Sequence, residues 1–148
     1  MKLKYIFIFL LTFLAMSAIY GGGMLMISPN GALLGLPLSI LDQTPFGSFL
    51  LPSIILFFVL GIIPLISAWA LLKNKKSSIG ENLNVFKDMQ WTWTFGIYSP
   101  FALIIWLQVQ MMLLNAVSWL HTFYMFLAIA IIFTGLMPSV RNYFKRSA

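Results

Sequence analysis

Long uncharged stretches dominate the chain and are separated by short segments that hold its charged residues. Residues 5–26 carry no charged side chain, and neither do residues 49–72. A helix needs roughly 20 mostly apolar residues to cross the hydrocarbon core of a bilayer. The pattern therefore predicts one membrane span in each stretch. Pro52 lies in the first turn of the second span, and Pro64 lies in its interior, where it is expected to kink the helix.

The longest uncharged stretch is residues 89–140, which contain no Asp, Glu, Lys or Arg. It is too long for a single crossing. At about 1.5 Å per residue it would far exceed the thickness of one bilayer. Asn115, Ser118 and His121 form a polar cluster within it, which we interpret as a turn. The sequence thus predicts a third span at 93–114 and a fourth at 119–138.

The segment between the first two spans, residues 27–48, is apolar yet rich in helix breakers. Prolines and glycines recur along it and prevent one continuous helix. We expect a loop that lies on the outer membrane surface or folds back between the spans, with a short interfacial helix around 36–42. Residues 73–90, by contrast, are polar and predict an ordinary cytoplasmic connection.

Composition supports a membrane protein. The chain is 61% hydrophobic and 8% charged, whereas soluble domains have about 25% charged residues. Too few charged side chains are present to cover a soluble core. The predicted fold is all-α: one transmembrane domain over residues 1–148, built as a four-helix bundle with an outer re-entrant or interfacial loop.

The basic residues set the predicted orientation. In the four-span arrangement all nine fall on one side of the membrane: Lys2, Lys4, Lys73, Lys75, Lys76, Lys87, Arg141, Lys145 and Arg146. The positive-inside rule makes that side cytoplasmic, so both termini are predicted to lie on the cytoplasmic side of the plasma membrane. Residues 5–20 also resemble a signal peptide, and cleavage near residues 15–17 would leave three spans. We favour an uncleaved span because the apolar stretch continues to Ile27.

The outer segment also has a distinctive series of glycine and proline steps. It contains Gly22-Gly23, Leu25, Pro29, Gly31, Leu34-Gly35-Leu36-Pro37, Leu41, Thr44-Pro45-Phe46 and Pro52. This series resembles that of a group of small, uncharacterised bacterial integral membrane proteins with four spans. Residues 106–110 (Trp-Leu-Gln-Val-Gln) are similar to the third span of that group. Ser28, Asn30 and Ser53 depart from its pattern. The resemblance implies the topology and no activity.

Few residues offer chemistry inside the predicted spans. Gln108 and Asn115 are seven positions apart and so share a helix face. Amides in a bilayer need partners, so we expect these side chains to face the bundle interior. With Tyr98 and Trp106 they are candidates either for lining a cavity or for contacting a partner protein. A purely structural role in bonds between the helices is the simpler interpretation.

Several functions are disfavoured by what the sequence lacks. There is no cysteine, only one histidine (His121) and only three carboxylates, Asp42, Glu81 and Asp88. Metal and cofactor sites are therefore not expected, and no catalytic set is apparent. The predicted spans hold no Asp, Glu, Lys or Arg, which argues against proton-coupled transport. The net charge of +6 lies next to spans and points to membrane lipid rather than nucleic acid.

These observations leave three functional hypotheses. The first is a non-enzymatic accessory or interaction protein of the plasma membrane, bound to another membrane protein or to copies of itself. The second is a carrier or binder of a lipid-like small molecule, with a cavity beneath the outer loop. The third is an oligomeric channel. The first is preferred because no catalytic group, cofactor motif or soluble domain is evident.

Overall fold

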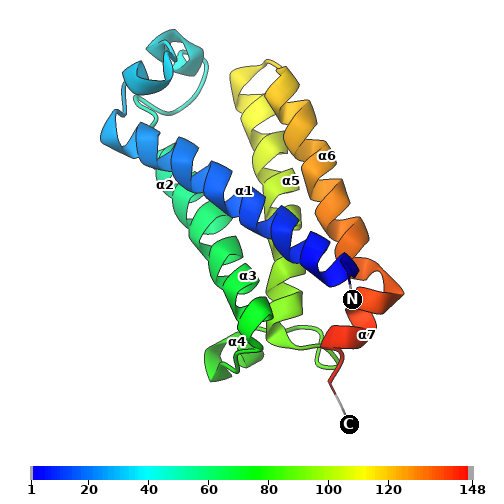
Figure 1. The fold of residues 1–148 in the computed structure, drawn as a ribbon. Coiled ribbons are helices and arrows are strands. Elements are labelled where there is room, and N and C mark those ends of the chain that lie inside the picture. The colour runs from blue at the N-terminus through cyan, green and yellow to red at the C-terminus, as the bar shows by residue number, and fades with distance from the viewer. Residues whose placement is uncertain (1, 147–148) are drawn as a thin grey trace.

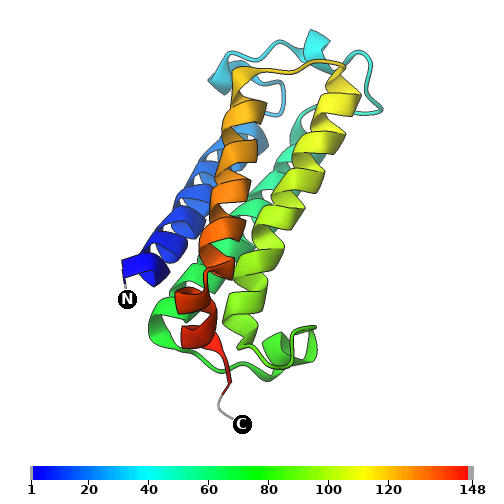
Figure 2. The ribbon, with the colours of Figure 1, turned by 90° about the vertical axis from the view of Figure 1, so that its right-hand side faces the viewer.

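The computed structural model describes residues 2–146, and this part of the chain is helical without a β-sheet. Four helical stretches are long and apolar enough to cross a membrane: Lys2–Ile27, Leu50–Lys73, Trp91–Leu114 and Trp119–Leu136. They match the four predicted stretches to within a turn of helix. Figures 1 and 2 show them side by side as a bundle, which confirms the all-α fold.

The helices follow one another in a simple order. The elements are α1 (Lys2–Ile27), η1 (Ala32–Leu34), η2 (Leu38–Leu41), α2 (Leu50–Phe57), η3 (Phe58–Ile62), α3 (Ile63–Lys73), α4 (Ser78–Asn82), α5 (Trp91–Leu114), α6 (Trp119–Leu136) and α7 (Pro138–Phe144). Helix α1 packs against α2, α3 and α6, while α5 packs against α3 and α6.

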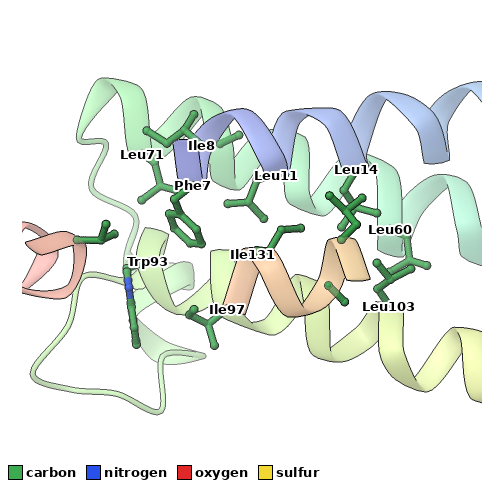
Figure 3. Packing of buried hydrophobic residues seen from close by; sticks show 14 of the residues in the cluster. Phe7, Ile8, Leu11, Leu14, Leu60, Leu71, Trp93, Ile97, Leu103 and Ile131 are labelled. Carbon is green, nitrogen blue, oxygen red and sulfur yellow. The ribbon is translucent and has the colours of Figure 1, made fainter. Parts of the chain in front are cut away.

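The side chain of Phe7 is fully buried in the part of the core that lies near the start of α1 (Figure 3). Its ring fills a slot between α5 and α6, where both helices carry glycine. A Cβ atom on Gly96 would come within 2.8 Å of the Phe7 ring, and one on Gly135 within 2.7 Å. Since close approach of helices in lipid depends on small residues, these glycines allow α1 to reach the core.

The second span is not a regular α-helix. Residues Phe58–Ile62 form a π-helical turn (η3) just before Pro64, which lies in the first turn of α3. Proline has no N–H, so the ladder of i to i+4 bonds is interrupted at this point, and a π turn is one way to absorb the break. Gly61 in this turn packs against Ile19 of α1. The predicted disturbance at Pro64 thus takes the form of a π turn.

The two ends of the bundle differ in charge. At one end lie the start of α1, the 73–90 connection with α4, and α7 (Figures 1 and 2). We call it the basic end, because it carries every lysine and arginine of the chain. The Nζ of Lys4 lies 3.8 Å from the ring centre of Tyr143, which ties α1 to α7 there. The opposite end, the loop end, holds residues 28–49 and the 115–118 turn.

Residues 28–49 form an ordered cap over the loop end. Leu25, Leu41 and Phe49 make a small buried cluster, against which Leu114 of α5 also packs. Gly31 turns the chain with φ +79°, and a Cβ there would lie 2.4 Å from the Leu36 carbonyl oxygen. The short helix expected around 36–42 appears as the 3-10 turn η2.

Candidate functional site

The polar residues predicted for the third span lie at different levels of α5. Tyr98 is near the basic end, where its hydroxyl donates to the Leu83 carbonyl (3.3 Å) and accepts from the Val85 N–H (3.2 Å). Asn115 terminates α5 at the loop end with φ +45°. Some 17 residues of helix, about 25 Å, separate the two. Tyr98 therefore anchors the 73–90 connection, and Asn115 caps a helix.

Trp106 and Gln108 differ in how far their side chains are buried. Trp106 is half-buried and packs against the main hydrophobic cluster. Gln108 is exposed, and no hydrogen bond joins its amide to another of residues 2–146. The structure thus does not bring Tyr98, Trp106, Gln108 and Asn115 together in one place.

Gln108 belongs to an exposed stripe along α5. The apolar members of this stripe are Phe101, Ile105, Val109 and Met112, of which Ile105 is 65% exposed and Met112 71% exposed. Their spacing of three, four and seven residues puts them on one helix face with Gln108. We call this surface the Gln108 face. It is apolar apart from a single amide.

Two hollows among residues 2–146 bear on the predicted cavity, and neither of these two is lined by Gln108, Tyr98 or Trp106. One, of about 320 Å³, lies at the loop end between residues 45–48 and the first turns of α2. The other, of about 710 Å³, lies at the basic end. The cavity role of the predicted residues stays a prediction, since these hollows are built from other side chains.

The basic-end hollow is formed by three segments distant in sequence. Residues 74–78 follow α3, residues 90–91 begin α5, and Lys145 and Arg146 follow α7. Glu81 also faces the hollow. We call this surface the basic pocket. It contains the cationic side chains Lys75, Lys76, Lys145 and Arg146.

Backbone pairing explains why the C-terminal segment reaches this place. The N–H of Gln90 donates to the Phe144 carbonyl (3.0 Å), and the N–H of Arg146 donates to the Asp88 carbonyl (2.9 Å). These bonds flank an isolated antiparallel bridge between Met89 and Lys145. The chain after α7 is therefore fastened to the segment before α5.

A buried asparagine organises the same region. Asn84 is 1% exposed, and its Nδ2 donates to the Met89 carbonyl (2.8 Å) and to Glu81 Oε2 (3.1 Å). Its Oδ1 accepts from the Thr94 hydroxyl (2.7 Å) and from the Phe86 N–H (3.0 Å). Because every polar atom of this amide is satisfied, Asn84 fixes the 81–94 segment.

Glu81 links that network to the pocket by an ion pair with Arg146. Burial acts to raise the pKa of the Glu81 carboxyl, but Arg146, the Asn84 amide and the Trp91 N–H together hold that pKa below its ordinary value. The carboxylate is thus charged at neutral pH and holds Arg146 in place. At the nearby surface, hydrogen bonds with Lys4 and Asn74 lower the pKa of Tyr143.

His121 has a structural role in the described structure. The Ser118 N–H donates to His121 Nδ1 (2.9 Å), which completes a capping box at the start of α6. Among residues 2–146 no group of three or more His, Cys, Asp or Glu side chains comes together as a metal site. The sequence also places His121 in this turn, but it carries no local sign of the basic pocket, because that pocket depends on the pairing of distant segments.

In comparisons with known proteins, no family model, curated protein or solved structure matches this chain. The resemblance to small bacterial membrane proteins with four spans therefore stays a prediction.

Proposed function

We propose that this protein is a non-enzymatic interaction protein of the plasma membrane, which binds another membrane protein through the Gln108 face of α5. Both termini lie in the cytoplasm, together with α4 and α7. The location of all basic residues at one end of the bundle supports that orientation, since cytoplasmic segments carry the excess of lysine and arginine.

The observation that supports a partner is the exposed amide of Gln108. Helix α5 has 24 residues, which is about 36 Å of helix, while the hydrocarbon core is about 30 Å thick. Gln108 lies six residues, or about 9 Å, before the end of α5, which is within the hydrocarbon layer of a centred span. An amide facing lipid there leaves its hydrogen bonds unmade, and such residues usually contact protein.

The rest of the face fits a partner helix. The amide is flanked by Ile105 and Met112, both largely exposed, and by Val109. A transmembrane helix with a polar side chain at the matching depth would bond the amide and cover the apolar neighbours. This arrangement resembles the interfaces by which helices associate in lipid, where packing is supplemented by a few hydrogen bonds.

Photo-cross-linking in the intact membrane tests this proposal. A photoreactive amino acid at Ile105, one turn from Gln108, is expected to give a discrete protein adduct. The same probe at Phe133, which is 63% exposed on α6, is expected to give none. Identification of the adduct distinguishes a different membrane protein from a second copy of this chain.

Substitutions in the same helix make the test specific. An interhelical hydrogen bond in lipid contributes about 0.6–1.4 kcal/mol, so Gln108→Leu is expected to reduce the Ile105 adduct roughly threefold to tenfold. Gln110→Leu is the matched control, because Gln110 lies about 200° around the helix from Gln108. Equal adducts from both variants, or no adduct from the Ile105 probe, would contradict the proposal.

A further inference from the structure

The basic pocket is a second candidate for binding, on different residues from the Gln108 face. Its volume of about 710 Å³ lies within the range of roughly 300–1,000 Å³ that is typical of small-molecule sites. Four cationic side chains surround it, with the indole of Trp91 and hydroxyl groups of Ser77 and Ser78. This set of groups suits a phosphate-bearing ligand, because cations and hydroxyl donors both bind phosphate oxygens.

The charge in the pocket is only partly neutralised. Arg146 pairs with Glu81, whose oxygens also accept from Asn84 and from the Trp91 N–H. This carboxylate is therefore already engaged. Lys75, Lys76 and Lys145 form no ion pair with any carboxylate of residues 2–146. Three cations consequently face one hollow without a charge partner in the described structure.

The walls of the pocket are held in place by the fold. The Trp91 Nε1–H donates to the Lys75 carbonyl (2.9 Å), and Gly80 lies against the Trp91 ring, where a Cβ would come within 2.5 Å. The backbone bonds of Gln90 and Arg146 fix the opposite wall. The lysines thus belong to two chain segments that the fold holds at one hollow, rather than to one flexible segment.

The position of the pocket favours a lipid over a soluble phosphate. It begins directly after α3, at the end of a predicted membrane span. Trp69, four residues before the end of α3, is 52% exposed, and the Nζ of Lys75 lies 5.6 Å from its ring centre. Exposed tryptophans concentrate at the membrane interface, which is the depth of lipid headgroups. The pocket therefore adjoins the headgroup layer.

We infer that the basic pocket binds the phosphate headgroup of an anionic phospholipid from the adjacent leaflet. Basic pockets between transmembrane helices on the cytoplasmic side are known to bind anionic headgroups. Lys75, Lys76 and Lys145 contact the phosphate oxygens, Ser77 adds a hydroxyl donor, and the acyl chains lie along the exposed side of α3 beside Trp69. The site rests on the membrane location and not on the partner proposed for Gln108.

The test uses the full-length protein in nanodiscs of phosphatidylcholine with increasing phosphatidylglycerol, followed by native mass spectrometry of the retained lipid. We expect phosphatidylglycerol to remain bound in preference to phosphatidylcholine. The variant Lys76→Gln/Lys145→Gln removes two pocket cations. If each lysine contributes about fivefold in affinity, the affinity of this variant for phosphatidylglycerol is expected to fall by roughly 25-fold.

The matched control, Lys2→Gln/Lys73→Gln, removes two exposed cations from the same end but outside the pocket. It is expected to retain the lipid, and thermal unfolding of both variants verifies that the fold persists. Equal loss in both variants would overturn the inference, because it would mean that general surface charge attracts the lipid. Displacement of the lipid by millimolar glycerol phosphate would overturn the lipid as occupant and assign the pocket to a soluble phosphate compound.

Discussion

The indole Nε1–H of Trp93 donates a hydrogen bond of 2.8 Å to the carbonyl oxygen of Gly135, and so joins α5 to the last turn of α6. The final carbonyls of a helix have no partner within it. Pro138 follows closely and has no N–H to offer. Trp93 is 2% exposed, and its ring also packs edge-on against Phe86. One buried side chain thus satisfies the end of α6 and anchors the 84–90 segment that forms part of the basic end.

Trp93→Phe is expected to destabilise the bundle, because it leaves the Gly135 carbonyl buried without a donor. The loss is roughly 1–3 kcal/mol in unfolding free energy. Denaturation by SDS in mixed micelles measures it. Trp119→Phe is the control, since Trp119 is 74% exposed and is expected to change stability by no more than about 0.5 kcal/mol. Equal effects of the two substitutions would contradict this role of Trp93.

Two adjacent glycines of α1 are expected to respond in opposite directions to alanine. A Cβ at Gly22 would lie 2.9 Å from the backbone nitrogen of Phe57, which cannot yield without moving α2. Gly22→Ala should therefore cost about 1–3 kcal/mol. A Cβ at Gly21 meets only Leu56 Cδ2 at 3.8 Å. Gly21→Ala should be neutral or stabilising by up to about 1 kcal/mol, owing to helix propensity. SDS denaturation measures the unfolding free energy of both variants. A loss of stability in Gly21→Ala would count against the packing described.

The pKa of Glu81 predicts an acid-sensitive contribution to stability. Its folded-state pKa is lowered, chiefly by Arg146 against the opposing effect of burial. The stabilisation is therefore fully present above the ordinary carboxyl value of 4.5 and is lost as the pH falls through the lower folded value. Thermal midpoints between pH 7 and pH 3 should decline less steeply in Glu81→Gln than in the wild type. Equal slopes in Glu81→Gln and in the wild type would contradict this contribution of the Glu81 carboxylate.

The orientation can be tested with single cysteines, because the chain has none of its own. Ser39→Cys lies in the exposed loop-end cap, and Asn82→Cys is exposed in α4 at the basic end. A membrane-impermeant maleimide should label the first in intact cells and the second only after lysis. The reverse pattern would place the basic end outside, against the positive-inside rule.

The elements that could be predicted from sequence are those marked by polarity or by a helix breaker. The turn between α5 and α6 was evident from Asn115, Ser118 and His121, because polar residues interrupt a stretch without charge. The disturbance of the second span followed from Pro64, although its form as a π turn did not. In each case a local chemical property of the residue dictates the local structure.

The direction in which each helix faces was not predictable in the same way. Lipid and protein core are both apolar, so a span has no polar face to mark its outside. Gln108 was expected to face the bundle interior, yet it is exposed on α5. The rotation of α5 is set instead by tertiary packing, including Trp93 against α6 and Gly96 against Phe7.

The basic pocket could not be predicted either, because its parts are far apart in sequence. Lys75 and Lys145 are 70 positions apart in the sequence. Both line one hollow because the bridge between Met89 and Lys145 fastens the C-terminal segment beside the start of α5. Such pairing leaves no local pattern of residues. The charges themselves were evident, but only the fold shows that they surround one hollow.

Native mass spectrometry of the tagged protein, extracted gently from its own membrane, tests the interaction role most directly. We expect a stoichiometric protein companion in the wild type and in Gln110→Leu, and its loss or strong reduction in Gln108→Leu. A lone chain that carries no protein companion, or a companion retained equally in Gln108→Leu, would contradict an interaction role for the Gln108 face.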